Sequence, residues 1–204
     1  MKSRKSLSLS DAFLFFKAFL KDPCHVGAVY PSSPFLADAM TSFDDFKKCS
    51  AIVELGCGTG AITEVILKKM PTNARYFGVE LNSECIALLR NRFPNVCFFH
   101  ASAEHLKKYL DDQQINQVDA IISGLPWATL PVDMQDTIFK QIINSLTPKG
   151  TFVTFAYTHA KIMPRAIKFK RKLQRSFKKV IIANTVWKNF PPAFFYVCTE
   201  PIKN

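Results

Sequence analysis

The chain shows short apolar runs separated by segments long enough to form helices. The apolar runs predict strands at 51–55, 75–80, 96–100, 118–122 and 150–157. The segments between and after them predict helices at about 60–70, 83–92, 103–110, 132–145 and 160–176. Because strands and helices alternate, we expect an α/β fold with a parallel sheet and helices on both faces.

The C-terminal end breaks this alternation. The segments 179–186 and 194–199 both resemble strands, and the connection through Asn189-Phe190-Pro191-Pro192 is too short to hold a helix. Two strands joined so closely must be antiparallel. We therefore expect a seven-stranded, mostly parallel sheet that closes with an antiparallel last strand.

The first part of the chain predicts helices of its own. Residues 11–21 resemble a short helix, and a second helix is expected to begin at Ser33-Pro34, an N-cap followed by proline. The expected organisation is an N-terminal helical extension over 1–48, followed by one α/β domain over 49–204. The hydrophobic content of 48% is sufficient for a packed core.

A glycine motif follows the first predicted strand. The run Ile52-Val53-Glu54-Leu55-Gly56-Cys57-Gly58-Thr59-Gly60 has three glycines at alternate positions. Glycine lets the backbone turn sharply and lets a ligand approach closely. The spacing differs from the dinucleotide pattern G-x-G-x-x-G, and no lysine–serine pair indicates a phosphate-binding loop.

Further candidate binding residues stand at the ends of the next strands. Glu80 ends the second predicted strand, 24 residues after Gly56, where a carboxylate can accept both hydroxyls of a ribose. The third strand leads to Ala101-Ser102-Ala103-Glu104, and the fourth ends in Ser123-Gly124-Leu125-Pro126-Trp127. Ligands of open α/β sheets bind at these carboxyl ends.

These motifs together resemble the class I S-adenosylmethionine-dependent methyltransferases, over residues 50–200. The resemblance implies a Rossmann-like fold and S-adenosylmethionine as cofactor. It implies cofactor contacts from Glu54, Gly56, Cys57, Gly58, Gly60, Glu80, Leu81, Ser102, Ala103 and Ser123. It places Gly124, Leu125, Pro126 and Trp127 beside the reactive methyl group.

The fourth-strand motif resembles two families with different substrates. In rRNA adenine dimethylases an asparagine stands where this chain has Gly124, and a C-terminal helical domain follows that is not seen here. The bacterial phospholipid N-methyltransferases resemble this chain in the block Phe15–Pro34 and in Gly124-Leu125-Pro126 with Leu130-Pro131. The second resemblance implies methylation of phosphatidylethanolamine and its methylated derivatives. An rRNA methylase and a non-catalytic, cofactor-binding basic adaptor are the alternatives.

The substrate amine would need a group to orient it or to take its proton. Tyr30, His25, Tyr157 and His159 are the candidates, with Tyr30 preferred, and Trp127 could hold a methylated cation against its ring.

The net charge of +11 is concentrated in one segment. Residues 161–179 hold nine basic and no acidic side chains, while the remaining chain has eighteen basic and sixteen acidic ones. This segment and the Phe-rich 11–21 helix predict contact with an anionic membrane surface. A nucleic-acid partner is less favoured, because no aromatic-basic RNA signature accompanies the charge.

The remaining features bear on location. No signal peptide or spanning run is seen, so we expect a cytoplasmic enzyme, peripheral on the inner face of the membrane. The six cysteines lack metal-ligand spacing and are interpreted as thiols, so no metal is expected. The oligomeric state is not predicted.

Overall fold

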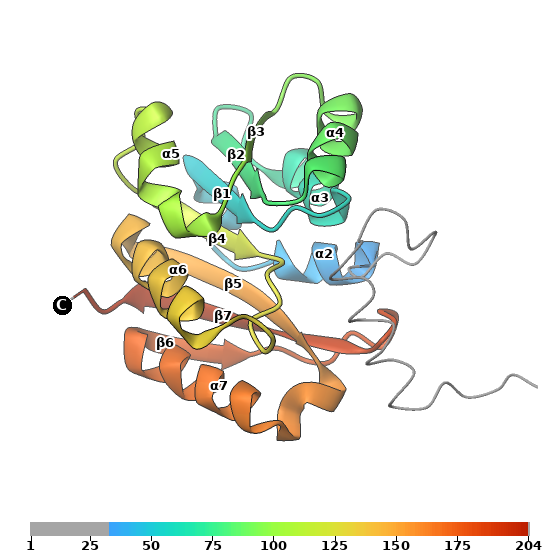
Figure 1. Ribbon diagram of the computed structural model, residues 1–204, viewed down its shortest axis with the longest axis vertical. Helices are drawn as coiled ribbons and strands as arrows, with labels where there is room; N and C mark the ends of the chain where they lie inside the picture. The colour runs from blue at the N-terminus through green and yellow to red at the C-terminus, as the bar shows by residue number, and fades with distance from the viewer. Residues whose placement is uncertain (1–32, 204) are drawn as a thin grey trace, which may run out of the picture.

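The structure, a computed structural model, describes residues 33–203. The predicted 11–21 helix, His25 and Tyr30 lie outside the described residues. One seven-stranded sheet forms the centre of the described part (Figure 1). Its strands are β1 (Ala51–Leu55), β2 (Arg75–Glu80), β3 (Cys97–His100), β4 (Val118–Ser123), β5 (Leu146–Tyr157), β6 (Phe177–Ile182) and β7 (Ala193–Pro201).

The strand order is β3-β2-β1-β4-β5-β7-β6. All pairs from β3 to β5 are parallel, and β7 runs antiparallel to both β5 and β6. This confirms the predicted fold class, including the antiparallel last strand. The order reverses direction between β1 and β4, and a binding site in such sheets is expected at the carboxyl ends of these two strands.

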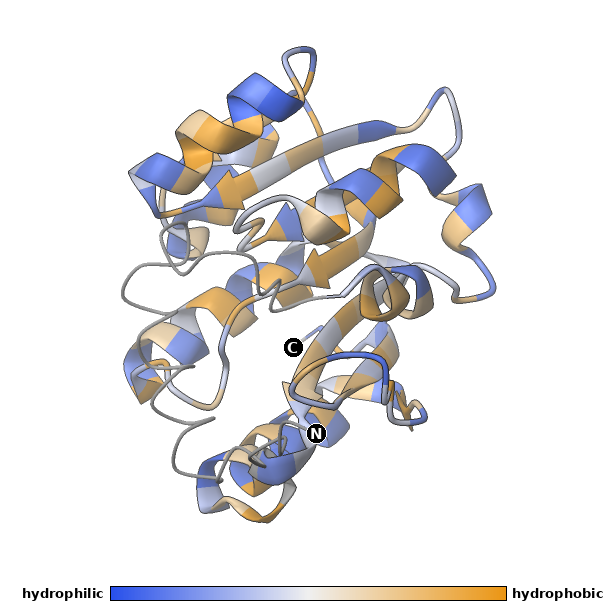
Figure 2. Cartoon of the chain, turned by 90° about the vertical axis from the view of Figure 1, so that its right-hand side faces the viewer, coloured by the Kyte–Doolittle hydropathy of each residue, from blue (hydrophilic) through white to orange (hydrophobic). Residues whose placement is uncertain are grey.

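Helices cover both faces of the sheet (Figure 1). On one face lie α5 (Leu106–Asp112), α6 (Val132–Ser145) and α7 (Pro164–Ser176), whose buried side chains join one hydrophobic cluster. On the other lie α2 (Pro34–Met40), α3 (Ala61–Lys69) and α4 (Ser83–Arg92). Three short 3₁₀ helices complete the described elements, at Phe46–Lys48, Ala103–His105 and Thr158–Ile162. In Figure 2 the strands are largely orange and the helices carry both colours, as expected for amphipathic helices around an apolar sheet.

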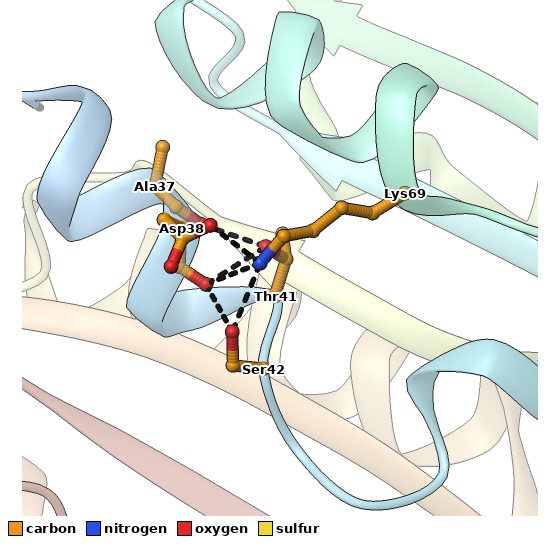
Figure 3. Close-up of polar contacts among 5 residues, drawn as sticks. All are labelled: Ala37, Asp38, Thr41, Ser42 and Lys69. Atoms are coloured by element: carbon orange, nitrogen blue, oxygen red, sulfur yellow. Dashed lines mark hydrogen bonds and ion pairs between the residues drawn. The ribbon is translucent and has the colours of Figure 1, made fainter.

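Helix α2 belongs to the same core as the sheet. Ser33 caps it as predicted, since its side chain accepts from the Leu36 amide, and Leu36, Ala37 and Met40 are fully buried. Lys69 of α3 fixes its C-terminal end by contacting the Asp38 carboxylate at 2.7 Å and the Ser42 hydroxyl at 2.9 Å (Figure 3). The N-terminal extension expected over residues 1–48 lies mostly outside the described residues, so its boundary with the α/β domain stays a prediction.

Several predicted element bounds differ from the structure. The fifth strand, expected to begin at residue 150, begins at Leu146, which already pairs with Val118 before a shift in register. The helix expected over 103–110 begins as a 3₁₀ turn, and α5 starts only at Leu106. Strand β6 ends at Ile182 rather than 186, and only Val186 bridges onward, to Ala193.

The cysteines partly correct the sequence interpretation. Cys49, Cys57, Cys97 and Cys198 are free, but Cys85 is disulfide-bonded, so the expectation of thiols throughout is wrong for Cys85. Within residues 33–203 no three His, Cys, Asp or Glu side chains are grouped as metal ligands. No helix in the same range is both long and apolar enough to span a bilayer.

Candidate cofactor and acceptor site

A cavity of about 1010 Å³ opens along the carboxyl edge of the sheet. One part, here called the cofactor half, is formed by the ends of β1, β2 and β3. Its lining residues are Gly56, Cys57, Gly58, Thr59, Ala61, Ile62, Val79, Glu80, Leu81, Asn82, Ala101, Ser102 and Ala103. The other part, the acceptor half, is formed by the segment after β4, by α6, by the end of β5 and the 3₁₀ turn that follows it, by α7 and by β7. Its lining residues are Gly124–Leu130, Met134, Ile138, Phe155, Ala156, Tyr157, His159, Met163–Ala166, Phe169 and Tyr196.

The β1–α3 turn places backbone, rather than side chains, on the cavity wall. Gly56, Gly58 and Gly60 all have positive φ, between 53° and 86°, which favours glycine. A Cβ on Gly58 would meet no atom within 4 Å, so the space in front of it is open to a ligand. Gly60 instead packs against α4, because a Cβ there would lie 2.8 Å from the Phe93 ring.

Glu80 organises the floor of the cofactor half. One carboxylate oxygen accepts from the Gly58 amide at 2.8 Å and the other from the Asn82 amide at 2.9 Å. Each carboxylate oxygen has a second acceptor position, which suits the paired hydroxyls of a ribose. The residues therefore fit the predicted cofactor: an acceptor pair beside a glycine turn with open space in front of it.

Three predicted cofactor residues do not line this cavity. Glu54 is fully buried beneath the turn, where it accepts from Tyr76 at 2.6 Å and Thr63 at 2.7 Å. Gly60 faces α4, as above. Ser123 is also fully buried, and its hydroxyl accepts from the Leu125 amide and the Trp127 indole. Their predicted cofactor contacts stay predictions; in this structure Glu54 and Ser123 are buried and Gly60 packs against α4, so each supports the turn from outside the cavity lining.

The other predicted cofactor residues lie on the wall. Cys57 and Ala103 are nearly buried there, while Leu81 is 66% exposed at the rim. Ser102 lines the cavity, but its hydroxyl donates to the Glu104 carboxylate and accepts from the Glu104 amide. A donor on the cofactor could still use the remaining acceptor position of that hydroxyl.

Strand β4 brings Gly124, Leu125, Pro126 and Trp127 to the junction of the two halves. Gly124 touches the β1 turn so closely that a Cβ would lie 2.5 Å from the Gly56 carbonyl oxygen. Trp127 lines the cavity but is only 3% exposed, and its ring stacks on Phe169 at 4.9 Å. The packing favours a structural role for the Trp127 ring over a cation-binding one.

Most of the acceptor half was missed from sequence. In the cofactor half, Asn82 was also missed, although it could have been found as the N-cap of α4 two residues after Glu80. Phe155, Met163, Arg165 and Tyr196 come from β5, α7 and β7, far from any local motif, and only the folded sheet brings them together. Tyr157 and His159 do line this half, whereas Tyr30 and His25 lie outside the described residues.

Comparisons with known proteins identify methyltransferases. A methyltransferase domain family matches residues 52–150. An ornithine lipid N-methyltransferase from Singulisphaera acidiphila is 31% identical over 193 residues, which cover 93% of this chain and 96% of that protein.

Two solved structures share the fold. The N-methyltransferase NodS from Bradyrhizobium japonicum, in complex with S-adenosylhomocysteine, superposes with a TM-score of 0.64 at 13% identity, covering 92% of this chain and 99% of that one. A putative methyltransferase from Streptococcus mutans, also bound to S-adenosylhomocysteine, gives 0.57 at 17% identity, covering 82% and 96%.

The first prediction concerns the cofactor half. We expect Gly58→Val to abolish cofactor binding, because a branched side chain would occupy the open space and strain a positive φ. Glu80→Ala should weaken binding by about 1.5–3 kcal/mol, as for hydrogen bonds to a charged group. Titration calorimetry with S-adenosylmethionine measures both, with Asp112→Ala at the exposed end of α5 as the control. Unchanged affinity in both variants would show that the site is misplaced.

The second prediction concerns Glu54. Burial raises its pKa to about 7, against hydrogen bonds from Tyr76 and Thr63 that lower it. A carboxyl that binds its proton more tightly in the folded state contributes its full stability to that state below its unfolded pKa of 4.5. This contribution to the free energy of unfolding is lost as pH rises through about 7. The loss is on the order of 3 kcal/mol.

Urea unfolding at about pH 5 and about pH 8 tests this. The unfolding free energy of the wild type, relative to that of Glu54→Gln, should be lower at about pH 8 than at about pH 5. The Gln amide keeps an acceptor for Tyr76 and Thr63 but does not titrate in this range. A constant difference at both pH values would show that Glu54 titrates normally.

Proposed function

The chain belongs to the class I S-adenosylmethionine-dependent methyltransferases, and we propose that it N-methylates the amine headgroup of a membrane lipid, with phosphatidylethanolamine and its methylated derivatives as acceptors. S-adenosylmethionine is the cofactor and supplies a methyl group bound to a sulfonium. The proposed acceptor class is supported by the ornithine lipid N-methyltransferase from S. acidiphila, which matches nearly the whole chain. Ornithine lipid is accordingly the second candidate acceptor.

The acceptor half suits a lipid headgroup better than a nucleobase. Apolar side chains from four elements, including Leu130, Met134 and Phe155, form most of its wall. An rRNA-type asparagine at position 124 is sterically excluded, since even a Cβ would clash with the Gly56 carbonyl. The chain thus lacks, and cannot readily regain, the side chain with which a base amine is held in the rRNA enzymes.

Arg165 adds charge recognition to these apolar walls. It lies in the first turn of α7 and lines the acceptor half. No acidic side chain within residues 33–203 forms an ion pair with it. Phosphatidylethanolamine carries a phosphate, and an ornithine headgroup a carboxylate, so a guanidinium here complements both.

In this arrangement the chain's own residues position the reactants. The turn at Gly58 and the Glu80 carboxylate hold the cofactor, while Gly124–Trp127 separate the two halves. The apolar wall excludes water from the amine. Alignment and water exclusion suffice for a direct methyl transfer, so no covalent nucleophile is required.

The third prediction tests the substrate class. Purified protein with methyl-labelled S-adenosylmethionine should place label in chloroform-extractable lipid and none in rRNA. Parallel vesicles containing phosphatidylethanolamine or ornithine lipid, in the same carrier lipid, separate the two headgroups. Label in rRNA adenine without label in lipid would overturn the proposed function. Label in ornithine lipid alone would show that ornithine lipid, and not phosphatidylethanolamine, is the acceptor.

The basic patch on α7 supports a peripheral position on anionic membranes at the cytoplasmic face. Phe169 and Leu173 point into the core, and Lys168, Arg171 and Arg175 lie exposed on the opposite face. Lys172, Lys178 and Lys179 form ion pairs with Asp136 or Glu200, which neutralises part of the charge. The three exposed residues are therefore the ones proposed to meet lipid phosphates.

The fourth prediction follows from that face. Charge reversal of Lys168, Arg171 and Arg175 should weaken flotation with anionic liposomes mainly at low salt, since surface attraction is screened over about 8 Å at physiological ionic strength. The matched control reverses Lys108, Lys140 and Lys149, which are also exposed but lie elsewhere. Equal losses in both triple variants would show that only net charge matters. Equal flotation of the wild type on zwitterionic liposomes would contradict the electrostatic contribution.

A further inference from the structure

We propose that His159 accepts the proton that the acceptor amine must lose before it can be methylated. The inference rests on the proposed function, since it assumes an amine headgroup in the acceptor half. It selects one of the two candidates that lie within the described residues, and it assigns the other, Tyr157, a positioning role.

The chemistry requires such a group at every methyl transfer. An alkyl ammonium has no lone pair, and its pKa resembles that of lysine, about 10.4, so it is protonated at neutral pH. The ammonium gives one proton to an unprotonated ring nitrogen of the imidazole. The nitrogen–carbon bond then forms as the carbon–sulfur bond breaks, and that electron pair stays on sulfur. One proton leaves for each methyl added, and the imidazolium releases it to solvent.

The acceptor half offers few alternatives among the described residues. Its polar side chains are Thr129, Tyr157, His159, Arg165 and Tyr196. No carboxylate of residues 33–203 lines this half. Glu80, which lines the cavity, lies in the cofactor half at the end of β2. Arg165 is a permanent cation, and a threonine hydroxyl is not a base at neutral pH.

The two tyrosines are excluded by their protonation. Burial raises the pKa of both Tyr157 and Tyr196, so each remains a neutral phenol at neutral pH. A phenol that keeps its proton can orient an amine but cannot take its proton. Among the described side chains of the acceptor half, His159 is left as the group with a basic nitrogen.

The surroundings of His159 hold it in a usable position. It lies in the 3₁₀ turn directly after β5, with its ring parallel to Tyr157 at 5.7 Å and 7°. The preceding backbone is fixed because the Thr158 amide donates to the Pro192 carbonyl at 2.9 Å. His159 therefore lines the cavity from a turn that is held where β5 ends and β7 begins.

The environment also tunes the proton transfer. Partial burial lowers the pKa of His159, which keeps the imidazole neutral and able to accept. Tyr157 of β5, Arg165 of α7 and Tyr196 of β7 are the titratable groups that line the acceptor half with it, and Glu80 and Cys57 line the cofactor half of the same cavity. The same apolar walls disfavour a desolvated ammonium and lower its pKa. The lowered pKa of the ammonium narrows its gap to that of the imidazole, whereas the lowered pKa of His159 only ensures that the ring is unprotonated at neutral pH.

The test compares His159→Gln with a matched control, His105→Gln. His105 is exposed and does not line the cavity. We expect His159→Gln to lower kcat on lipid vesicles by about 10²-fold or more, the typical contribution of a general base. Affinity for S-adenosylmethionine by calorimetry should stay within about twofold of the wild type, and the control should match the wild type throughout.

Two further measurements separate proton transfer from mere positioning. A headgroup analogue with a weakly basic amine, unprotonated at neutral pH, should lose much less activity in His159→Gln than the natural headgroup does. Added imidazole should restore activity to His159→Ala. Near-wild-type kcat in His159→Gln, or equal losses on both amines without imidazole rescue, would overturn the role of His159. A wild type that labels no lipid would instead overturn the proposed function.

Discussion

The contact between Gly56 and Gly124 is the constraint on which the site depends. The Gly56 amide donates to Val79 of β2 and the Gly124 amide donates to Leu55 of β1, both at 2.8 Å. These bonds join the carboxyl ends of three neighbouring strands. The two turns then approach so closely that neither residue could carry a side chain without displacing backbone or the Leu125 side chain. Glycine at 124 is therefore required by the packing of the turns, and is not simply a lost asparagine.

This constraint separates two kinds of chemistry in one cavity. On the cofactor side the recognising groups are backbone amides and the Glu80 carboxylate, which is itself held by the turn. On the acceptor side β4 supplies backbone and apolar surface, so polar recognition has to come from elsewhere. Apart from Thr129, the polar side chains come from β5, the 3₁₀ turn after it, α7 and β7, on the far side of the strand-order reversal.

Support for the turn comes from a buried layer beneath it. Gly78 of β2 leaves space that the Cys57 sulfur fills, since a Cβ there would lie 2.5 Å from Cys57 Sγ. Beside it, Glu54 accepts from Thr63 and Tyr76, which ties β1 to α3 and β2. One Glu54 oxygen has no hydrogen-bond partner, and burying a carboxyl this way is costly unless it is protonated. Glu54 thus supports the glycine turn through its hydrogen bonds with Thr63 and Tyr76. An acidic residue can therefore be part of the motif without reaching the cavity.

The sequence predicted what depends on local spacing. The strands β1 to β4, the helices α4 and α6, the Ser33 cap and the antiparallel close of the sheet follow from periodicity and loop length, and the structure confirms them. The cofactor half could be located because each of its segments follows directly after a strand. Glu54, Gly60 and Ser123 do not line the cavity, because a motif gives positions along the chain but not the direction in which each residue faces.

The acceptor half could not be predicted in the same way, for a physical reason. Its residues have no common spacing, since β7 inserts between β5 and β6 and so carries Tyr196 to the cavity wall from near the C-terminus. Similarly, Arg165 reaches the wall only because the turn after β5 directs the start of α7 back toward β4. A binding site assembled from such distant elements can change its substrate while the glycine turn and sheet order stay the same. For this fold, the sequence motifs therefore identify the cofactor, whereas the wall proposed to bind the acceptor is formed by the long-range packing of β5, α7 and β7.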